Sequence, residues 1–197
     1  MVNIIANFIM LFVSVYLMWL LTDVPIKKYI PLLMVVALLS VFKVMPTGIG
    51  IVLGAYFVGV CEDEKEKEVY TFFFHVSLAG TAVMLVSTLI SGIELPHGIL
   101  NWVLWLMPFV FIIVTSKTRG GADTDFMIVA YLCTFLMGLE SIAILVMFFI
   151  GYVLQLSRQL CACVIEKKSY SEVKKTHRPF LLSLYLGFLV GIAVFLK

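Results

Sequence analysis

Two aspartates stand at the ends of apolar runs, and their type and spacing could support chemistry. Asp63 closes the run that ends in Val60, and Asp123 follows Gly120-Gly121-Ala122 between two other apolar runs. Carboxylates at a membrane boundary are costly, so their presence needs a reason. Two carboxylates brought together can share one proton, because like charges a few ångströms apart cannot both ionise. One then acts as a base toward water and the other as an acid, which is the chemistry of an aspartic peptidase.

The glycines before Asp123 fit this chemistry. Gly120 and Gly121 remove side chains directly before the carboxylate, which permits a positive φ and the close approach of a substrate backbone. No metal or other cofactor is expected. The three histidines, which lie in different segments and on both predicted faces of the membrane, do not form a ligand set: they are His75, His97 and His177.

The elements that must position these residues are membrane helices. The chain has 197 residues, of which 62% are hydrophobic and 13% charged, whereas soluble domains are roughly 45–50% apolar. Apolar runs recur along the whole chain, so the sequence predicts an integral membrane protein without a separate soluble domain. The lipid bilayer is therefore an expected partner, and nucleic acid is not.

The apolar runs indicate how many helices there are. A spanning helix needs about 20 apolar residues, and the runs cover residues 4–21, 30–42, 47–60, 70–93, 99–114, 126–156 and 179–196. Lys43 and Pro46 break the stretch from 30 to 60, and Gly138 with Glu140 marks a turn within 126–156. The expected fold is all-α, a polytopic membrane bundle of about eight helices of uneven length.

The distribution of lysine and arginine supports this count. If Asp63 is cytoplasmic, alternation of the helices puts the basic residues at 27–28, 65–67, 117–119 and 158–178 on the same side. Only Lys43 and Lys197 fall on the opposite side. Because cytoplasmic loops carry the excess of positive charge, both aspartates are predicted to face the cytoplasm.

The residues around both aspartates resemble one protein family. Gly120-Gly121-Ala122-Asp123 resembles the GxGD motif of intramembrane aspartyl peptidases, and specifically the GGAD form of the type IV prepilin and archaeal preflagellin peptidases. The segment from Asp63 to Val69 resembles the first catalytic segment of that family. Asp63 and Asp123 are 60 positions apart with two helices between them, which is similar to the family's arrangement. His177-Arg178-Pro179-Phe180 with Gly187 is similar to its last helix.

The resemblance divides the chain into two parts. It covers residues 47–196, which implies a six-helix GxGD-type peptidase core at 46–197 and an additional pair of transmembrane helices at 1–45. The chain departs from the family pattern at two places. Ala122 replaces the second glycine of the commoner GxGD form, and Tyr70-Thr71 stands where many members have Pro-Asn. These departures bear on the subfamily more than on the chemistry.

The resemblance also implies an activity. The implied activity is that of a membrane aspartyl endopeptidase, which removes the short basic leader of type IV pilin-like or archaellin precursors. Cleavage would take place at the cytoplasmic face of the plasma membrane of a prokaryote, in particular an archaeon. Asp63 and Asp123 would activate water at the scissile carbonyl. Many bacterial relatives also methylate the new N-terminus through a cysteine-bearing loop near the start of the chain. No such insert is present here, so cleavage without methyltransferase activity is expected. Four glutamates near Asp63 would attract the basic leader: Glu62, Glu64, Glu66 and Glu68.

Two further aspartates are rivals for the catalytic roles. The segment that opens with Asp23 and ends in Ile30-Pro31 also resembles the family's first catalytic segment. Its spacing is one residue longer than the family pattern, and Asp23 lies 100 positions from Asp123 with four helices between them, so Asp63 is favoured. Asp125 lacks the preceding glycines, and a place near a helix N-terminus is a sufficient structural explanation for it.

The competing class of function is a non-catalytic small transporter or membrane assembly subunit. In such a protein the acidic residues would gate protons or cations, and short broken helices would be corresponding features of two repeats. The sequence has no convincing internal repeat, because the two acidic loops differ and only one contains Gly-Gly. The peptidase interpretation is therefore preferred.

Overall fold

The described part of the chain is almost entirely helical. The computed structural model describes residues 2–22, 24–66, 69, 71–92, 99–116, 121–167, 169–175 and 180–196, without the side chains of residues 2, 66, 171, 174 and 175. The helices are, in chain order, α1 (Val2–Thr22), the 3₁₀ helix η1 (Ile26–Tyr29), α2 (Ile30–Phe42), α3 (Ile49–Glu66), α4 (Thr71–Ser91), α5 (Ile99–Ser116), α6 (Gly121–Leu136), α7 (Ser141–Glu166), α8 (Tyr170–Lys175) and α9 (Leu181–Phe195). Within these ranges there is no strand, and the prediction of an all-α bundle with eight longer helices is confirmed.

Both breaks predicted in the long apolar stretches occur where they were expected. α2 ends at Phe42 and α3 begins at Ile49, while α6 ends at Leu136 and α7 begins at Ser141. Gly138, in the second break, has a φ of +67°, which glycine adopts without the steric cost of a Cβ. The backbone therefore reverses at this glycine, and α6 and α7 become separate helices.

Three helices continue beyond the apolar runs that predict them. α3 extends past Val60 to Glu66, α6 begins at Gly121 rather than at Phe126, and α7 extends past Leu156 to Glu166. Glutamate, lysine, glutamine and arginine are good helix formers and continue α3 and α7, whereas the aspartates at the start of α6 are stabilised by the dipole of the helix N-terminus. Asp63 and Asp123 consequently lie in helical turns and not in loops.

Four helices are long and apolar enough to cross a membrane. They are Asn3–Thr22 of α1, Thr71–Ser91 (α4), Ile99–Ser116 (α5) and Ser141–Glu166 (α7). Large apolar side chains stand exposed along them, for example Ile90 at 82% and Phe149 at 68% exposure. Contiguous apolar surface of this kind marks contact with a membrane or a partner. The chain is thus a membrane protein.

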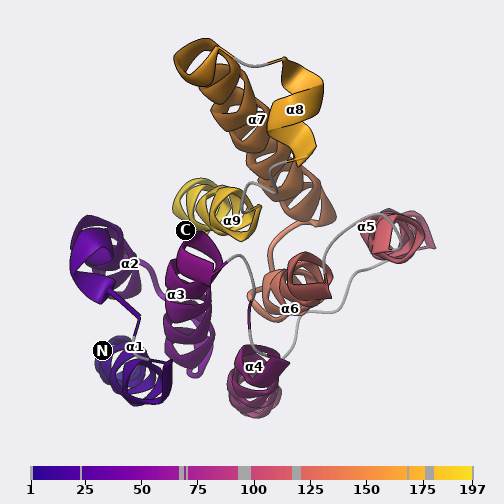
Figure 1. The fold of residues 1–197 in the computed structure, drawn as a ribbon. Helices are drawn as coiled ribbons and strands as arrows, with labels where there is room; N and C mark the ends of the chain where they lie inside the picture. The colour runs from indigo at the N-terminus through magenta and orange to yellow at the C-terminus, as the bar shows by residue number, and fades with distance from the viewer. Residues whose placement is uncertain are drawn as a thin grey trace.

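α3, α6 and α9 form the inner part of the bundle, and the other long helices surround them (Figure 1). α3 packs against α1, α4 and α9, and α9 packs against α7, α3 and α6. The Phe126 ring of α6 lies 4.6 Å from the Tyr56 ring of α3 and 5.9 Å from the Phe188 ring of α9. Phe126 therefore fixes the three inner helices against one another.

The N-terminal helix is held closely against α3. A Cβ on Gly50 would collide with the backbone of Asn7, and one on Gly54 would collide with Ser14. Small residues four positions apart commonly allow membrane helices to approach this closely. The Asn7 amide also donates to the Pro46 carbonyl at 3.1 Å and accepts from the Gly48 N–H at 3.0 Å. α1 and α3 are therefore parallel and end at the same end of the bundle.

α7 and α9 form a second close pair. A Cβ on Gly187 would collide with the carbonyl of Met147, and one on Gly151 would lie 3.1 Å from the Cα of Leu184. The pairing of Gly187 with Met147 and of Gly151 with Leu184 makes these two helices antiparallel. α9 thus begins at the end of the bundle where α7 ends.

Candidate functional site

Asp63 lies in the charged last turns of α3, beyond its apolar part, and against the start of α9. The backbone N–H of Leu181 donates a hydrogen bond to its carboxyl group. The oxygen Oδ2 is buried and has no hydrogen-bond partner among the described residues. Burial raises the pKa of Asp63 to about 6, the Leu181 N–H and the Arg158 charge oppose this rise, and the Glu64 charge adds to it. A carboxyl that titrates near neutral pH can give or accept a proton during a reaction.

An ion pair lies beside Asp63. Nη2 of Arg158, on α7, lies 2.6 Å from Oε1 of Glu64, on α3. Nη1 of Arg158 donates to the hydroxyl of Ser183 on α9 at 3.4 Å, and that hydroxyl donates to Oε1 of Gln155 at 3.0 Å. Side chains from three helices therefore form one polar network around the Asp63 end of α3.

Asp123 lies in the first turn of α6 and is partly buried. The unpaired N–H groups of a helix N-terminus stabilise a negative charge at this position. Gly120 lies outside the described residues. Gly121 is exposed, its φ is not positive, and a Cβ built on it would meet no described atom within 4 Å. Neither packing nor backbone conformation in the described part requires a glycine at position 121, whereas the following Ala122 is partly buried.

The two predicted catalytic aspartates lie at the same end of the bundle on neighbouring helices. α3 runs antiparallel to α4, since Gly48 meets Gly80 and Gly59 meets Phe73. α4 in turn runs parallel to α6, because Thr81 meets Cys133 and Thr88 meets Leu136.

The contact between Tyr56 and Phe126 gives a common reference point, from which the positions of the Asp63 and Asp123 carboxyl groups along the bundle can be compared. With a rise of about 1.5 Å per residue, Asp63 lies about 10 Å beyond Tyr56 and Asp123 about 4–5 Å beyond Phe126, in the same direction. The two aspartates therefore differ by about 6 Å in position along the bundle.

The rival aspartates have different surroundings. Asp125 lies near His75 of α4 and near the Tyr56 hydroxyl of α3. Burial raises the pKa of Asp125, and the His75 charge opposes that rise. Asp23 lies outside the described residues. The preceding helix α1 ends at Thr22, at the same end of the bundle as Asp63.

The four glutamates do not form one open acidic surface. Glu62 is buried, with 2% of its surface exposed, and Glu64 is paired with Arg158. The side chain of Glu66 and the whole of Glu68 lie outside the described part. An attraction for a basic leader therefore stays a prediction for Glu66 and Glu68, while Glu62 and Glu64 have contacts within the protein.

The described ranges contain no group of three or more His, Cys, Asp or Glu residues that could hold a metal ion. Of the histidines, His97 and His177 lie outside these ranges. The carboxyl groups at this end of the bundle can exchange protons with water and with a bound substrate.

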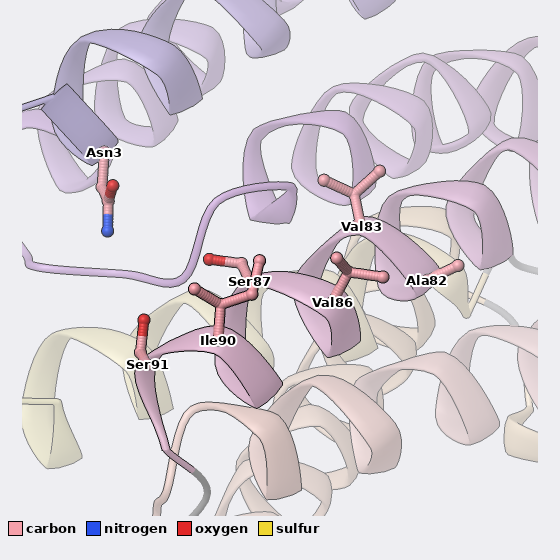
Figure 2. Close-up of a pocket in the computed structure, with 7 residues that line it drawn as sticks. All are labelled: Asn3, Ala82, Val83, Val86, Ser87, Ile90 and Ser91. Atoms are coloured by element: carbon pink, nitrogen blue, oxygen red, sulfur yellow. The ribbon is translucent and has the colours of Figure 1, made fainter.

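A groove of about 580 Å³ opens between the start of α1 and the second half of α4 (Figure 2). Its lining is mostly apolar and contains no acid or base: Asn3, Ala82, Val83, Val86, Ser87, Ile90 and Ser91. α4 begins beside Asp125 and runs away from it, so the groove lies at the opposite end of the bundle from Asp63. It is not part of the site around the two aspartates.

Sequence reasoning missed the role of Arg158 and of the start of α9. Arg158 was expected in a basic loop, but it lies within α7. The spacing of Gln155 and Arg158 could have indicated this role, because residues three positions apart share one face of a helix if the helix continues. The hydrogen bond from the Leu181 N–H to Asp63 depends on tertiary packing, and no local pattern predicts it.

Comparison of the chain with family models, with curated proteins and with solved structures gives no match. The assignment of a function therefore depends on the residues and the geometry of this site.

Proposed function

We propose that the protein is a membrane aspartyl endopeptidase that removes the short basic leader of pilin-like or archaellin precursors at the cytoplasmic face of the membrane. One observation carries this proposal. The carboxyl group of Asp63, whose oxygen Oδ2 is buried and has no hydrogen-bond partner among the described residues, lies at the same end of the bundle as Asp123 on another inner helix. Gly121, for which packing gives no reason, supports it by leaving open space before Asp123.

The surroundings of the two aspartates suggest a division of roles. Burial keeps Asp63 partly protonated near neutral pH, since its pKa is raised to about 6, and this suits the acid. Asp123 lies at the N-terminus of α6, where the helix dipole favours the anion, and this suits the base. Two carboxyl groups whose environments differ in this way are typical of acid–base pairs in hydrolases.

The reaction follows from these roles. The Asp123 carboxylate takes a proton from water while the water oxygen bonds to the scissile carbonyl carbon, and Asp63 gives its proton to the carbonyl oxygen. In the resulting diol, Asp123 passes its proton to the amide nitrogen, the C–N bond breaks, and Asp63 recovers a proton from a hydroxyl group. The products are a carboxylic acid and an amine, and both aspartates return to their starting protonation states.

The proposed substrate suits the position of the site. A pilin-like precursor has its cleavage point at the boundary between a basic leader and an apolar helix. The apolar helix would lie in the bilayer against the bundle, with the leader in water at the Asp63 end. Lysine and arginine residues cluster in the segments that join the helices at this end, and this favours the cytoplasm.

Purified full-length protein in lipid nanodiscs, incubated with an archaellin-like or pilin-like precursor, tests the proposal. We expect one cut, directly before the apolar helix of the precursor, with an unmethylated new N-terminus in the mass spectrum. A matched precursor whose leader lysines and arginines are replaced by glutamine controls for non-specific proteolysis. Absence of cleavage for both precursor types, together with proton or cation flux in liposomes, would favour the transporter class instead.

A further inference from the structure

The polar network beside Asp63 connects three helices that no other described side-chain network joins. Arg158 of α7 contacts Glu64 of α3 at 2.6 Å and the hydroxyl of Ser183 of α9 at 3.4 Å. Ser183 is fully buried and is also bonded to Gln155 of α7. Arg158 therefore bridges α3 to the start of α9, where the Leu181 N–H binds Asp63.

This ion pair is partly shielded from water. The Arg158 side chain is 30% exposed and that of Glu64 is 17% exposed, so solvent screens the pair less than it screens a surface salt bridge. A guanidinium group can bind two acceptors at once in a fixed geometry, which an ammonium group cannot. The pair thus has a defined orientation.

Several other titratable groups lie at this end of α3 or beside it. On α3 itself these are Cys61, Glu62, Glu64 and Lys65. Tyr29 of η1 interacts electrostatically with Glu64, Cys61 and Arg158.

The remaining elements present other groups at this end. α4 presents His75, whose described partners are Thr71 and Asp125, α6 presents Asp123 and Asp125, and α9 presents the Leu181 N–H. Among all these groups, Arg158 is the cation that acts on Asp63.

We propose that Arg158 is a positioning residue, which holds the start of α9 against α3. Its positive charge acts on two carboxyl groups, those of Glu64 and Asp63. In this arrangement Glu64 draws part of the Arg158 charge away, so Asp63 keeps a higher affinity for its proton. The inference concerns the charge state of Asp63 in the folded protein. It rests on the proposed function only for its consequence on cleavage.

The arrangement predicts opposite effects for the two partners. Arg158→Met removes the cation, so the pKa of Asp63 rises by about half to one pH unit. Glu64→Gln removes an anion and releases Arg158 toward Asp63, so the pKa falls by a similar amount. The double variant, which lacks both charges, returns close to the wild-type value of about 6.

Infrared titration of the full-length protein in nanodiscs measures this directly. The carbonyl stretch of a protonated carboxyl group is followed against pH, and the band that disappears in Asp63→Asn is the Asp63 signal. Arg158→Lys keeps the charge but loses the bridging geometry, so its midpoint should move less than that of Arg158→Met. Lys167→Gln removes one exposed charge from the end of the same helix, about 13 Å further along, and should leave the midpoint unchanged.

The outcomes are distinct. Opposite shifts for Glu64→Gln and Arg158→Met support the proposal, and unchanged midpoints or shifts in the same direction overturn it. If Arg158→Met does not fold, a failure of Glu64→Gln to lower the midpoint overturns it alone. The titration needs no substrate, so its result stands whether or not the protein cleaves a precursor. For an active peptidase, the pH profile of kcat/KM should move in the same directions.

Discussion

At the scale of single residues, burial and position distinguish the aspartates more clearly than sequence does. The residue types and the glycines pointed to Asp63 and Asp123, but the sequence could not show that one oxygen of Asp63 is buried with no partner in the described part of the chain. That property arises because α9 covers the end of α3, a contact between segments more than 100 positions apart. The sequence therefore predicted Asp63 as a candidate acid, but it could not predict the raised pKa of this residue.

The raised pKa of Asp63 makes stability depend on pH. Because its pKa is about 6 when folded against an ordinary value of 3.8, the folded state binds the proton more tightly than the unfolded state does. Its stabilising contribution is complete below pH 3.8 and is lost as pH rises through about 6. We expect Asp63→Asn to flatten this part of the stability profile in thermal unfolding in detergent. Glu140→Gln, at an exposed carboxyl group, serves as the control and should leave the slope unchanged.

A substitution at Gly121 tests whether this glycine is needed for the fold or for the reaction. A Cβ at this position meets no described atom within 4 Å, so Gly121→Ala should keep the melting temperature or raise stability by about 0.4–1 kcal/mol. The same methyl group stands before Asp123, where it should lower kcat/KM by about tenfold or more. A variant with lower stability and unchanged cleavage would show that the glycine serves the fold instead.

The buried hydroxyl groups of Tyr56 and Ser77 lie close enough to interact, although no hydrogen bond of good geometry joins them in the described part of the chain. The Tyr56 ring packs 4.6 Å from the Phe126 ring, and phenylalanine would keep this contact while removing the poorly paired hydroxyl group. Tyr56→Phe should therefore be neutral or stabilising by up to about 1 kcal/mol, and Tyr56→Ala should cost about 3–5 kcal/mol. Chemical denaturation measures both, and a strongly destabilised Tyr56→Phe would reveal a bound water or another partner.

At the scale of helices, the sequence predicted where apolar segments begin and break, but not how far the helices continue. Pro46 and Gly138 are local signals, and both breaks occur beside them. The end of α3 lies in charged sequence and that of α7 contains Ser157-Arg158-Gln159, where charge alone suggests a loop. Helix formers such as Glu64 and Arg158 continue these helices because they pair with each other across α3 and α7.

The close approach of α1 to α3 can be tested within one helix. A Cβ on Gly54 would lie 2.8 Å from the Leu11 carbonyl oxygen, whereas one on Gly59 would lie 3.6 Å from its nearest described neighbour, a methyl carbon of Val69. Gly54→Ala should force α1 outward and destabilise the protein by about 1–3 kcal/mol, and Gly59→Ala should be tolerated. Equal melting temperatures for the two variants would contradict the described packing of α1.

At the scale of the whole molecule, the bundle gathers its candidate chemistry at one end. Parallel α1 and α3 end there, and α4, α6 and α9 begin there. None of the described residues that line the apolar groove at the other end is titratable (Figure 2). Alternation of helices along the chain predicted this common end, because two spans separate Asp63 from Asp123. The tight docking of the N-terminal pair through Asn7 and Gly54 was not predictable from composition, since it depends on two specific surfaces meeting.

The most direct test of the account is cleavage of one precursor by four aspartate variants under identical conditions, with folding checked by gel filtration. We expect Asp63→Asn and Asp123→Asn each to lower kcat/KM at least about 100-fold, while Asp125→Asn and Asp23→Asn keep most of the activity. Cleavage that persists in Asp63→Asn or in Asp123→Asn would contradict the assignment. Loss of cleavage in Asp23→Asn with retention in Asp63→Asn would transfer the role of the first aspartate to Asp23.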